Sequence, residues 1–473
     1  MSKLYIFGIG GTGSRVLKSL TMLMASGVKI QDNSGVAFEI VPIIIDPDHA
    51  AADLTRTVKL MKDYQKVYNH LDHNSSNGST FFGTKINMDI IPEVRMPLNN
   101  TLDVDFKEYI GLSLMKDENG NPNANYALAS MLFSQNNLDA KMEVGFKGNP
   151  NIGSVVLNQF AMSQEFIDFA SSFGQNDRIF IISSIFGGTG ASGFPLLLKK
   201  LRAVSQEMSG NNNVKNAVVG AVTVLPYFDV KPNEKSEIDS STFVSKAKAA
   251  LSYYDRNMTE ANVLYYIGDK VSKQYENSEG GTTQRNEAHF VELASALAIV
   301  DFACIPDLKT KNGEPSSTVY KEFGIREAVD QIIYSSLDGK TNHKVKKSLT
   351  AFTLFCKYLD EQIWDSRSQP WAKDHNFDDS FLKSPFFQTE LADIRIAFIE
   401  WLTEMNNNFR SFAPYDLREK KDDVYSMIKG EKPASMKGFN YFNKSNYALF
   451  DTVLNEKQTK VKRDASKEHI FIE

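Results

Sequence analysis

Three glycine-rich segments of this sequence combine residue types that suit the binding of an anion. They are Gly8-Ile-Gly-Gly-Thr-Gly13, Gly148-Asn-Pro-Asn-Ile-Gly153 and Gly187-Gly-Thr-Gly-Ala-Ser-Gly193. Glycine lacks the Cβ atom that would keep an anion away from the backbone, and a helix that follows presents N–H groups and the positive end of its dipole. The pattern favours phosphate binding, although each segment alone is also compatible with a turn that holds no ligand.

The elements around these loops are those that would position a phosphate. The apolar run Ile179–Phe186 precedes the third loop and Leu196–Leu201 follows it, which predicts a buried strand, a tight loop and a helix. Leu4–Phe7 leads into the first loop in the same way, and an amphipathic helix over Ser154–Phe169 follows the second. Neither the first nor the third loop has the Lys-Ser or Lys-Thr of an ATPase P-loop after its last glycine.

Further buried strands are predicted at Phe38–Asp46, Ala217–Pro226 and Asn262–Lys270. Asp46 stands at the carboxyl end of its strand, which is where open α/β sheets bind ligands. Gly8, Gly10 and Gly13 also satisfy the dinucleotide fingerprint, so an NAD(P)- or FAD-dependent oxidoreductase with Asp46 on the ribose is a rival interpretation. Asp46 is further from Gly13 than the roughly 20 residues of that fingerprint, which favours a role at a phosphate-bound Mg²⁺ or its water.

Composition places the chain among ordinary globular proteins. Its 473 residues are 42% hydrophobic and 23% charged, and the net charge of −5 argues against nucleic acid as a partner. Two cysteines, Cys304 and Cys356, are too few for a disulfide framework and favour a cytoplasmic location. The sequence shows neither a signal peptide nor an apolar run near the ~20 residues that a membrane span needs.

The loops together resemble those of the tubulin/FtsZ-like superfamily. Gly187–Gly193 is similar to the tubulin motif Gly-Gly-Thr-Gly-Ser-Gly, and Gly148–Gly153 closely matches the Gly-Asn-Pro-Glu-x-Gly of FtsZ. The rival interpretation explains only the first loop, whereas the resemblance covers roughly residues 4 to 300. It implies an α/β fold: a Rossmann-type nucleotide-binding domain with a parallel sheet over residues 1–285, carrying an insertion at about 47–144, and a central helix at 286–305.

The last third departs from this family. Two apolar stripes at helical spacing, starting at Val345 and at Leu391, predict a divergent and mainly helical module over residues 306–473, where the family has a strand-rich domain. The spacing favours helix packing within the chain, and it also permits a protein partner on this module.

The resemblance implies that GTP or GDP binds with Mg²⁺ across the strand ends. Residues implied in the site are Gly10, Gly11, Thr12, Gly13, Gly148, Asn149, Pro150, Gly187, Gly188, Thr189 and Gly190 near the phosphates, Asp46 at the metal, Asp229 at the sugar and Asn286 at the base. Asn286 is equally suited to cap the central helix. Gly268 stands where the family has a base-reading Asn, so guanine specificity is less secure than nucleotide binding, and Asp269 is the possible substitute.

Hydrolysis in this family uses acidic residues that a neighbouring subunit supplies in trans. The corresponding loop falls near 301–322, where Asp307 and Glu314 are the candidates, without the family's full pattern. The sequence therefore predicts head-to-tail self-association, as an oligomer or filament, with slow GTP hydrolysis at the interface. The first alternative is a nucleotide-gated scaffold that does not polymerise, and the oxidoreductase is the more distant one.

Overall fold

A six-stranded parallel sheet forms the centre of this computed structural model, in the order β10-β6-β4-β3-β1-β2. The strands are β1 (Lys3–Ile9), β2 (Glu39–Ile45), β3 (Arg178–Ser184), β4 (Val218–Val224), β6 (Val263–Ile267) and β10 (Val319–Glu322). The first five are nearly continuous apolar runs because helices cover both faces of a parallel sheet. The predicted α/β class with a parallel sheet is confirmed.

The structure describes residues 1–73, 81–99, 101, 103–142, 145–146, 148–231, 242–270, 274–275, 281, 286–323, 329–417, 427–430, 446–457 and 466–473. Within these ranges, no helix is both long and apolar enough to cross a bilayer.

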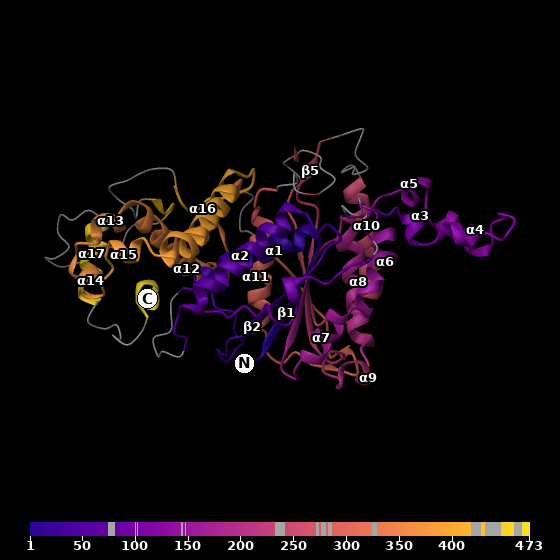
Figure 1. The fold of residues 1–473 in the computed structure, drawn as a ribbon, viewed down its shortest axis with the longest axis horizontal. Coiled ribbons are helices and arrows are strands. Elements are labelled where there is room, and N and C mark those ends of the chain that lie inside the picture. The colour runs from indigo at the N-terminus through magenta and orange to yellow at the C-terminus, as the bar shows by residue number, and fades with distance from the viewer. Residues whose placement is uncertain are drawn as a thin grey trace.

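Two helical layers enclose the sheet (Figure 1). On one face lie α1 (Gly10–Ala25), α2 (Ala52–Asn69) and α11 (Phe290–Cys304). On the other lie α6 (Pro150–Val156), η3 (Leu157–Met162), α7 (Gln164–Ser172), α8 (Gly188–Ala203), α9 (Gln206–Ser209) and α10 (Phe243–Asn257). Almost every residue of α11 is buried, because this helix is packed between α1, the sheet and the C-terminal part of the chain.

The central helix begins at Phe290, later than the predicted start at residue 286. Its N-cap is His289, whose Nδ1 accepts from the Val291 N–H at 3.0 Å, while Glu292 accepts from the His289 N–H at 3.2 Å. This capping box fixes the start of the helix at Phe290, so Asn286 does not serve as its cap.

The segment predicted as an insertion divides into two parts. α2 packs on α1, and Ile40 and Ile44 of β2 form parallel bridges with Ile86 and Arg95, so this first part belongs to the core. The second part, residues 105–141, projects from the molecule as an arm (Figure 1). The 3-10 helix η1 (Pro92–Val94) precedes the arm, which contains α3 (Phe106–Tyr109), η2 (Leu112–Met115), α4 (Ala124–Leu132) and α5 (Gln135–Leu138).

The C-terminal part is mainly helical and packs on α1 and α2. Its main helices are α12 (Gly339–Glu361) and α16 (Ala392–Asn407), and the indole N–H of Trp401 donates to Ser19 Oγ at 3.2 Å. The predicted stripes run from Val345 to Ile363 and from Leu391 to Phe409, and both are buried within the chain except for the exposed Phe409. The other elements are η5 (Tyr334–Ser336), α13 (Ile363–Ser366), α14 (Pro370–Asp374), α15 (Asp379–Leu382), η6 (Phe386–Leu391), α17 (Asn446–Lys457), α18 (Lys467–Ile472) and the paired β11 (Gln331–Ile332) and β12 (Ser411–Phe412).

The edge strand β10 lies beyond residue 306, where the helical module is predicted to start. Its four residues, Val319–Glu322, alternate between half-buried and exposed because the strand lies at the sheet edge. Such a short, polar strand lacks the apolar run that marks the other strands, so the sequence pattern missed it.

Candidate functional site

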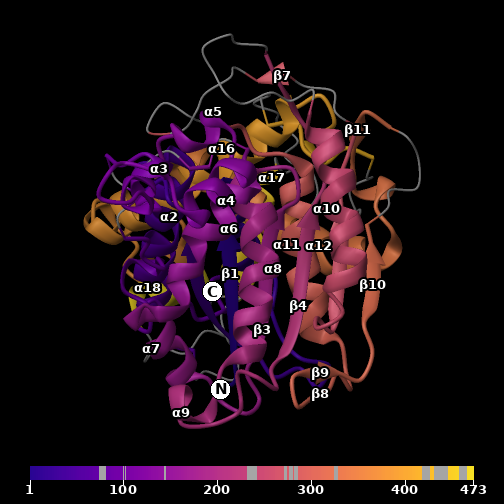
Figure 2. The same ribbon diagram turned by 90° about the vertical axis from the view of Figure 1, so that its right-hand side faces the viewer.

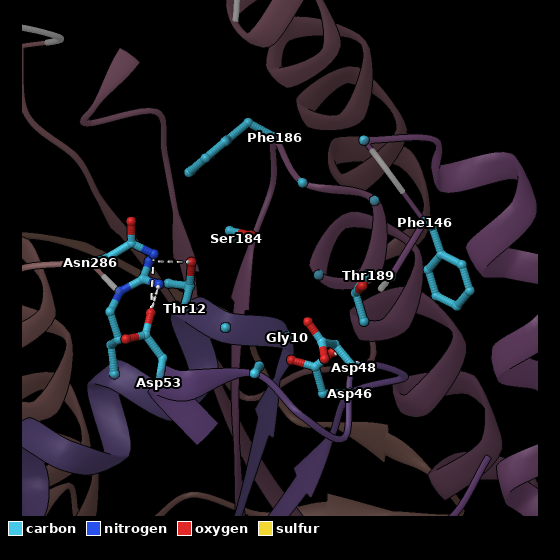
Figure 3. A pocket seen from close by; sticks show the side chains of 18 of the residues that line it. Gly10, Thr12, Asp46, Asp48, Asp53, Phe146, Ser184, Phe186, Thr189 and Asn286 are labelled. Atoms are coloured by element: carbon cyan, nitrogen blue, oxygen red, sulfur yellow. Dashed lines mark hydrogen bonds and ion pairs between the residues drawn. The ribbon is translucent and has the colours of Figure 1, made fainter. Parts of the chain in front are cut away.

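An open cleft lies at the carboxyl ends of the parallel strands, where the chain passes from strand to helix (Figure 3). Its volume is about 1120 Å³, counting the solvent-filled space at its mouth. It is lined by Gly10, Gly11, Thr12, Arg15, Asp46, Asp48, Ala51, Asp53, Gly145, Phe146, Gly148, Ser184, Phe186, Gly187, Gly188, Thr189, Gly190, Phe228, Val230, Phe243, Tyr275 and Asn286. Residues from all three glycine loops therefore meet at one site.

Three of the helices that begin at this cleft, α1, α6 and α8, follow the glycine-rich loops and have no side-chain cap. The N-cap residues of α1, α6 and α8 are Ile9, Asn149 and Gly187, and none of their side chains caps the helix. Elsewhere, α7 and α12 are capped by Ser163 and Asp338. The N–H groups at an uncapped helix start need another acceptor, and the helix dipole favours a negative one. Three such starts make the cleft suited to a ligand with several phosphate groups.

The glycines of the third loop have two different roles. A Cβ on Gly190 would lie 2.5 Å from the Ser184 carbonyl oxygen, and one on Gly188 would lie 2.9 Å from Phe146 Cβ. These two glycines let α8 pack closely on β3 and on the second loop. A Cβ on Gly187 meets only the Ser184 hydroxyl, at 3.2 Å, so this position is bounded by a side chain rather than by backbone.

Two buried carboxylates, Asp46 and Asp48, follow β2 and lie between Gly10 and Thr189 in Figure 3. The Asp48 N–H donates to Asp46 Oδ1 at 3.1 Å, and Asp48 Oδ2 accepts from the Gly281 N–H at 2.6 Å. Burial, together with the charge of Asp48, raises the pKa of Asp46 to about 7. Carboxylates are ligands that Mg²⁺ accepts, so this pair fits a metal that also contacts phosphate.

The described residues contain no cluster of three or more His, Cys, Asp or Glu side chains that could hold a metal alone. A Mg²⁺ at the carboxylate pair would therefore take its remaining ligands from phosphate oxygens and water. Asp48 was not singled out from the sequence, although its place two residues after a strand-end carboxylate was a usable signal.

A buried arginine forms another wall of the cleft. Arg15 donates from Nε to Glu292 at 2.6 Å and from Nη1 to Asp53 at 3.0 Å, while Nη2 donates to the Tyr227 hydroxyl at 2.9 Å and to Thr12 Oγ1 at 3.3 Å. Burial raises the pKa of Glu292 despite Arg15. Burial also acts to raise the pKa of Asp53, but the charges of Arg15 and Arg56 outweigh it and hold that pKa below its ordinary value.

Four aromatic side chains line another part of the cleft: Phe186, Phe228, Phe243 and Tyr275. The ring centroids of Phe186 and Phe228 are 5.5 Å apart, as are those of Phe228 and Tyr275. A flat purine can pack on such rings. These residues were not predicted from the sequence, because aromatic side chains after strands are more often simply core.

Most of the predicted phosphate and metal residues line the cleft, and Gly13, Asn149, Pro150 and Asp229 do not. A Cβ on Gly13 would lie 2.4 Å from the Gly8 carbonyl carbon, so Gly13 allows α1 to pack on β1. Asn149 and Pro150 start α6 beside Gly148, which does line the cleft. Asp229 lies in β5 (Asp229–Val230), which pairs with β7 (Gln274–Tyr275), and its Oδ2 accepts from Gln274.

Of the three positions considered for base recognition, one lines the cleft and two do not. Asn286 lines the cleft, and its Nδ2 donates to Asp53 at 3.0 Å. A Cβ on Gly268 would lie 2.8 Å from Leu225 Cβ, so this position has no room for the family's Asn. Asp269 accepts from Arg410 Nε at 2.6 Å and is therefore engaged by the C-terminal part.

Asp307 and Glu314 lie at the opposite end of the sheet from the cleft. They are exposed, in and beside the hairpin of β8 (Thr310–Lys311) and β9 (Glu314–Pro315), which Figure 2 shows near the N-terminus. Arg178, which starts β3, donates to the Ile305 carbonyl at 3.1 Å and ties this segment to the amino ends of the strands. The two carboxylates cannot reach the cleft of their own chain.

The parallel sheet, the glycine loops at its carboxyl end and the buried helix that follows match the arrangement expected from the sequence. No protein-family model and no curated protein sequence matches the chain.

The chain is similar in structure to CetZ from Methanosaeta thermophila strain DSM 6194, at 17% identity and a TM-score of 0.27, covering 57% of this chain and 46% of that one. GDP-bound CetZ1 from Haloferax volcanii is matched at 14% identity and a TM-score of 0.28, covering 56% and 51%. An FtsZ dimer from M. jannaschii is matched at 14% identity and a TM-score of 0.27, covering 64% and 53%. The chain thus spans about half the length of these structures.

Proposed function

We propose that this protein binds a guanine nucleotide, GTP or GDP, with Mg²⁺ in the cleft at the carboxyl end of its sheet. The observation that carries the proposal is the meeting of three uncapped helix starts beside two buried carboxylates. The helix starts of α1, α6 and α8 would hold the phosphates, and Asp46 and Asp48 would face the metal. Mg²⁺, when bound, would neutralise phosphate charge that otherwise faces these carboxylates.

The base would lie against the aromatic wall, with Asn286 beside it. The preference for guanine rests on the resemblance of the loops at Gly148–Gly153 and Gly187–Gly193 to those of the tubulin/FtsZ-like superfamily. Because one N–H of the Asn286 amide donates to Asp53, its oxygen and its second N–H remain to read the base.

The direct test is to identify the nucleotide that co-purifies with the protein and to titrate GTP, ATP and NAD by calorimetry. We expect GTP or GDP to co-purify, and GTP to bind with Mg²⁺ more tightly than ATP or NAD. Recovery of a dinucleotide, or of no bound purine in any titration, would contradict the proposal and favour the oxidoreductase or a ligand-free loop cluster.

The binding of GTP·Mg²⁺ should depend on pH through Asp46. The metal needs the carboxylate, whereas the proton occupies it below its pKa of about 7. We expect the affinity to fall about tenfold per pH unit below 7 and to level off above it. Asp46→Asn should bind GTP·Mg²⁺ weakly, with an affinity that does not change between pH 5.5 and 8.5. The substitution should lower the affinity for GTP mainly when Mg²⁺ is present. An equal slope in wild type and Asp46→Asn would show that another group titrates.

We further propose head-to-tail self-association with slow GTP hydrolysis at the interface. Support comes from the position of the cleft and of Asp307 and Glu314 at opposite ends of the strands, so that one subunit's acids would face the next subunit's nucleotide. A heterologous contact of this kind repeats, and it builds an open filament unless its rotation closes a ring. The alternative is a nucleotide-gated scaffold that binds GTP and does not polymerise.

The double variant Asp307→Asn with Glu314→Gln should still bind GTP and should lose turnover by roughly 100-fold, in the range of general acid–base catalysis. Phosphate release is measured across protein concentrations, alongside pelleting with GTP, GDP and a non-hydrolysable analogue. The exposed Glu207, replaced by Gln, and the exposed Asp255, replaced by Asn, give a control. Turnover that is independent of concentration in a monomeric sample would contradict a shared site, and neither assembly nor turnover would favour the scaffold.

A further inference from the structure

Two polar side chains of the C-terminal part reach the segment that carries Asn286. They are Glu404, in α16, and Asn408, the C-cap of that helix. Glu404 Oε2 accepts from the Ala288 N–H at 3.0 Å, and Asn408 Nδ2 donates to the Ala288 carbonyl at 3.1 Å. Both backbone polar groups of Ala288, which follows Asn286 by two residues, are therefore bonded to the C-terminal part.

The carboxylate of Glu404 also joins the two helices that flank Asn286. It accepts from Lys18 of α1 at 3.2 Å and lies 3.5 Å from Arg56 of α2. Arg56 in turn donates to the Asn286 carbonyl at 3.2 Å and to Asp53 at 2.8 Å. Asp53 accepts from the side-chain amide of Asn286 at 3.0 Å, beside Thr12 in Figure 3. The backbone and the side chain of Asn286 are thus both held by a network that Glu404 completes.

Asn408 has a second partner among the four aromatic side chains that line the cleft. Its Nδ2 donates to the Tyr275 hydroxyl at 3.4 Å, and Asn408 is only 5% exposed. A buried amide is oriented by its protein partners because water does not compete for its N–H groups. Asn408 therefore links the positions of Tyr275 and of the Ala288 peptide, which lie on two separate segments of the chain.

We propose that Glu404 and Asn408 position Asn286 and Tyr275 for the purine base, so that the C-terminal part sets the preference for guanine. This inference rests on the proposed binding of GTP or GDP. It goes beyond that function because it assigns base selection to a part of the chain from which none of the described cleft-lining residues comes. Glu404 and Asn408 are therefore positioning residues, which act through side chains that do line the cleft.

The phosphate side of the cleft should not depend on these two residues. The helix starts proposed for the phosphates belong to α1, α6 and α8, which follow the glycine loops, whereas Asn286 and Tyr275 lie where the base would pack. Loss of positioning should therefore reduce discrimination between bases and leave phosphate binding intact. A general loss of structure would reduce both.

Calorimetry on the full-length protein with GTP, ATP and tripolyphosphate, each with Mg²⁺, tests the proposal. Glu404→Gln keeps the shape of the side chain and removes its charge, and Asn408→Leu removes the donor to Ala288 and Tyr275. In each variant we expect the ratio of GTP affinity to ATP affinity to fall by about tenfold, the effect of losing a hydrogen bond or two. The affinity for tripolyphosphate should stay close to that of wild type.

Asn406→Leu is the matched control. Asn406 lies two residues from Glu404 in α16 and so on the other side of the helix, and this variant should keep the wild-type ratio. An unchanged ratio in either Glu404→Gln or Asn408→Leu would overturn the proposal. An equal loss of affinity for GTP, ATP and tripolyphosphate would overturn it too, because it would indicate a purely structural role.

A double-mutant cycle with Asn286→Ala tests whether Glu404 acts through Asn286. Asn286→Ala alone should lower the ratio of GTP affinity to ATP affinity, and adding Glu404→Gln should cause little further loss. Additive losses would overturn the assignment. A wild type that binds no purine nucleotide would contradict the proposed function itself, whereas a wild type selective for GTP, with variants equally selective, would contradict only this inference.

Discussion

Gly187→Val should abolish nucleotide binding while leaving the protein folded. Gly187 is the N-cap of α8 and lines the cleft, with φ −89° and ψ 165°, an extended conformation that valine adopts readily. Its new Cβ would contact only the Ser184 hydroxyl, at 3.2 Å. The valine methyl groups would then occupy the space where the helix start meets a phosphate. We expect affinity for GTP·Mg²⁺ to fall by at least about 100-fold, near 3 kcal/mol, measured by calorimetry.

Gly190→Val is the informative contrast, because the sequence motif treats both glycines alike. A Cβ on Gly190 would lie 2.5 Å from the Ser184 carbonyl oxygen and 2.7 Å from the Ser184 nitrogen, both backbone atoms that cannot move aside cheaply. We expect this variant to unfold at markedly lower denaturant concentration, so that lost binding there would follow from lost structure. Wild-type affinity in Gly187→Val would show that the phosphate site lies elsewhere.

Arg15→Met should be the most destabilising single substitution near the cleft. Methionine removes the cation that Glu292, Asp53 and Tyr227 share, and leaves two carboxylates buried at 2% and 5% exposure of their side chains. Breaking a buried ion pair by removing one partner costs about 3–5 kcal/mol. Chemical denaturation at pH 7.5 measures this loss. Arg15→Lys should recover only part of it, because an ammonium cannot reach three partners with the fixed geometry of a guanidinium.

The pH dependence of stability shows whether Arg15→Met is destabilised by the loss of a charge or by poorer packing. Without Arg15, the folded-state pKa of Glu292 rises further above that of the unfolded chain, and the pKa of Asp53 rises from its lowered value. The folded variant then binds more protons than the unfolded chain, so its stability increases as pH falls. We expect the difference in the free energy of unfolding between wild type and Arg15→Met to become smaller as the pH falls from 7.5 to 5. At pH 7.5, the double variant Arg15→Met with Glu292→Gln should be more stable than Arg15→Met. A gap of constant size would indicate a packing defect.

From the sequence alone, one can predict the parallel α/β sheet, the three glycine loops and the strand-end Asp46. These features are local. An apolar run, the glycines after it and a helical stripe can each be recognised from the order of neighbouring residues in the chain. The two buried stripes of the C-terminal part could be predicted for the same reason. The four-residue β10 could not be predicted, because a polar edge strand is defined by its hydrogen-bonded neighbour and not by its own sequence pattern.

Which residues share the cleft depends on how the chain folds. Asp53, the four aromatic residues and the partners of Arg15 come together from segments far apart in the chain, and a single sequence holds no signal for such proximity. The structure also separated Gly187 from Gly190, because the difference between them is the distance from a Cβ to the Ser184 backbone. Likewise, Leu225 fills the space beside Gly268, and Asp269 accepts from Arg410; folding alone brings these neighbours together.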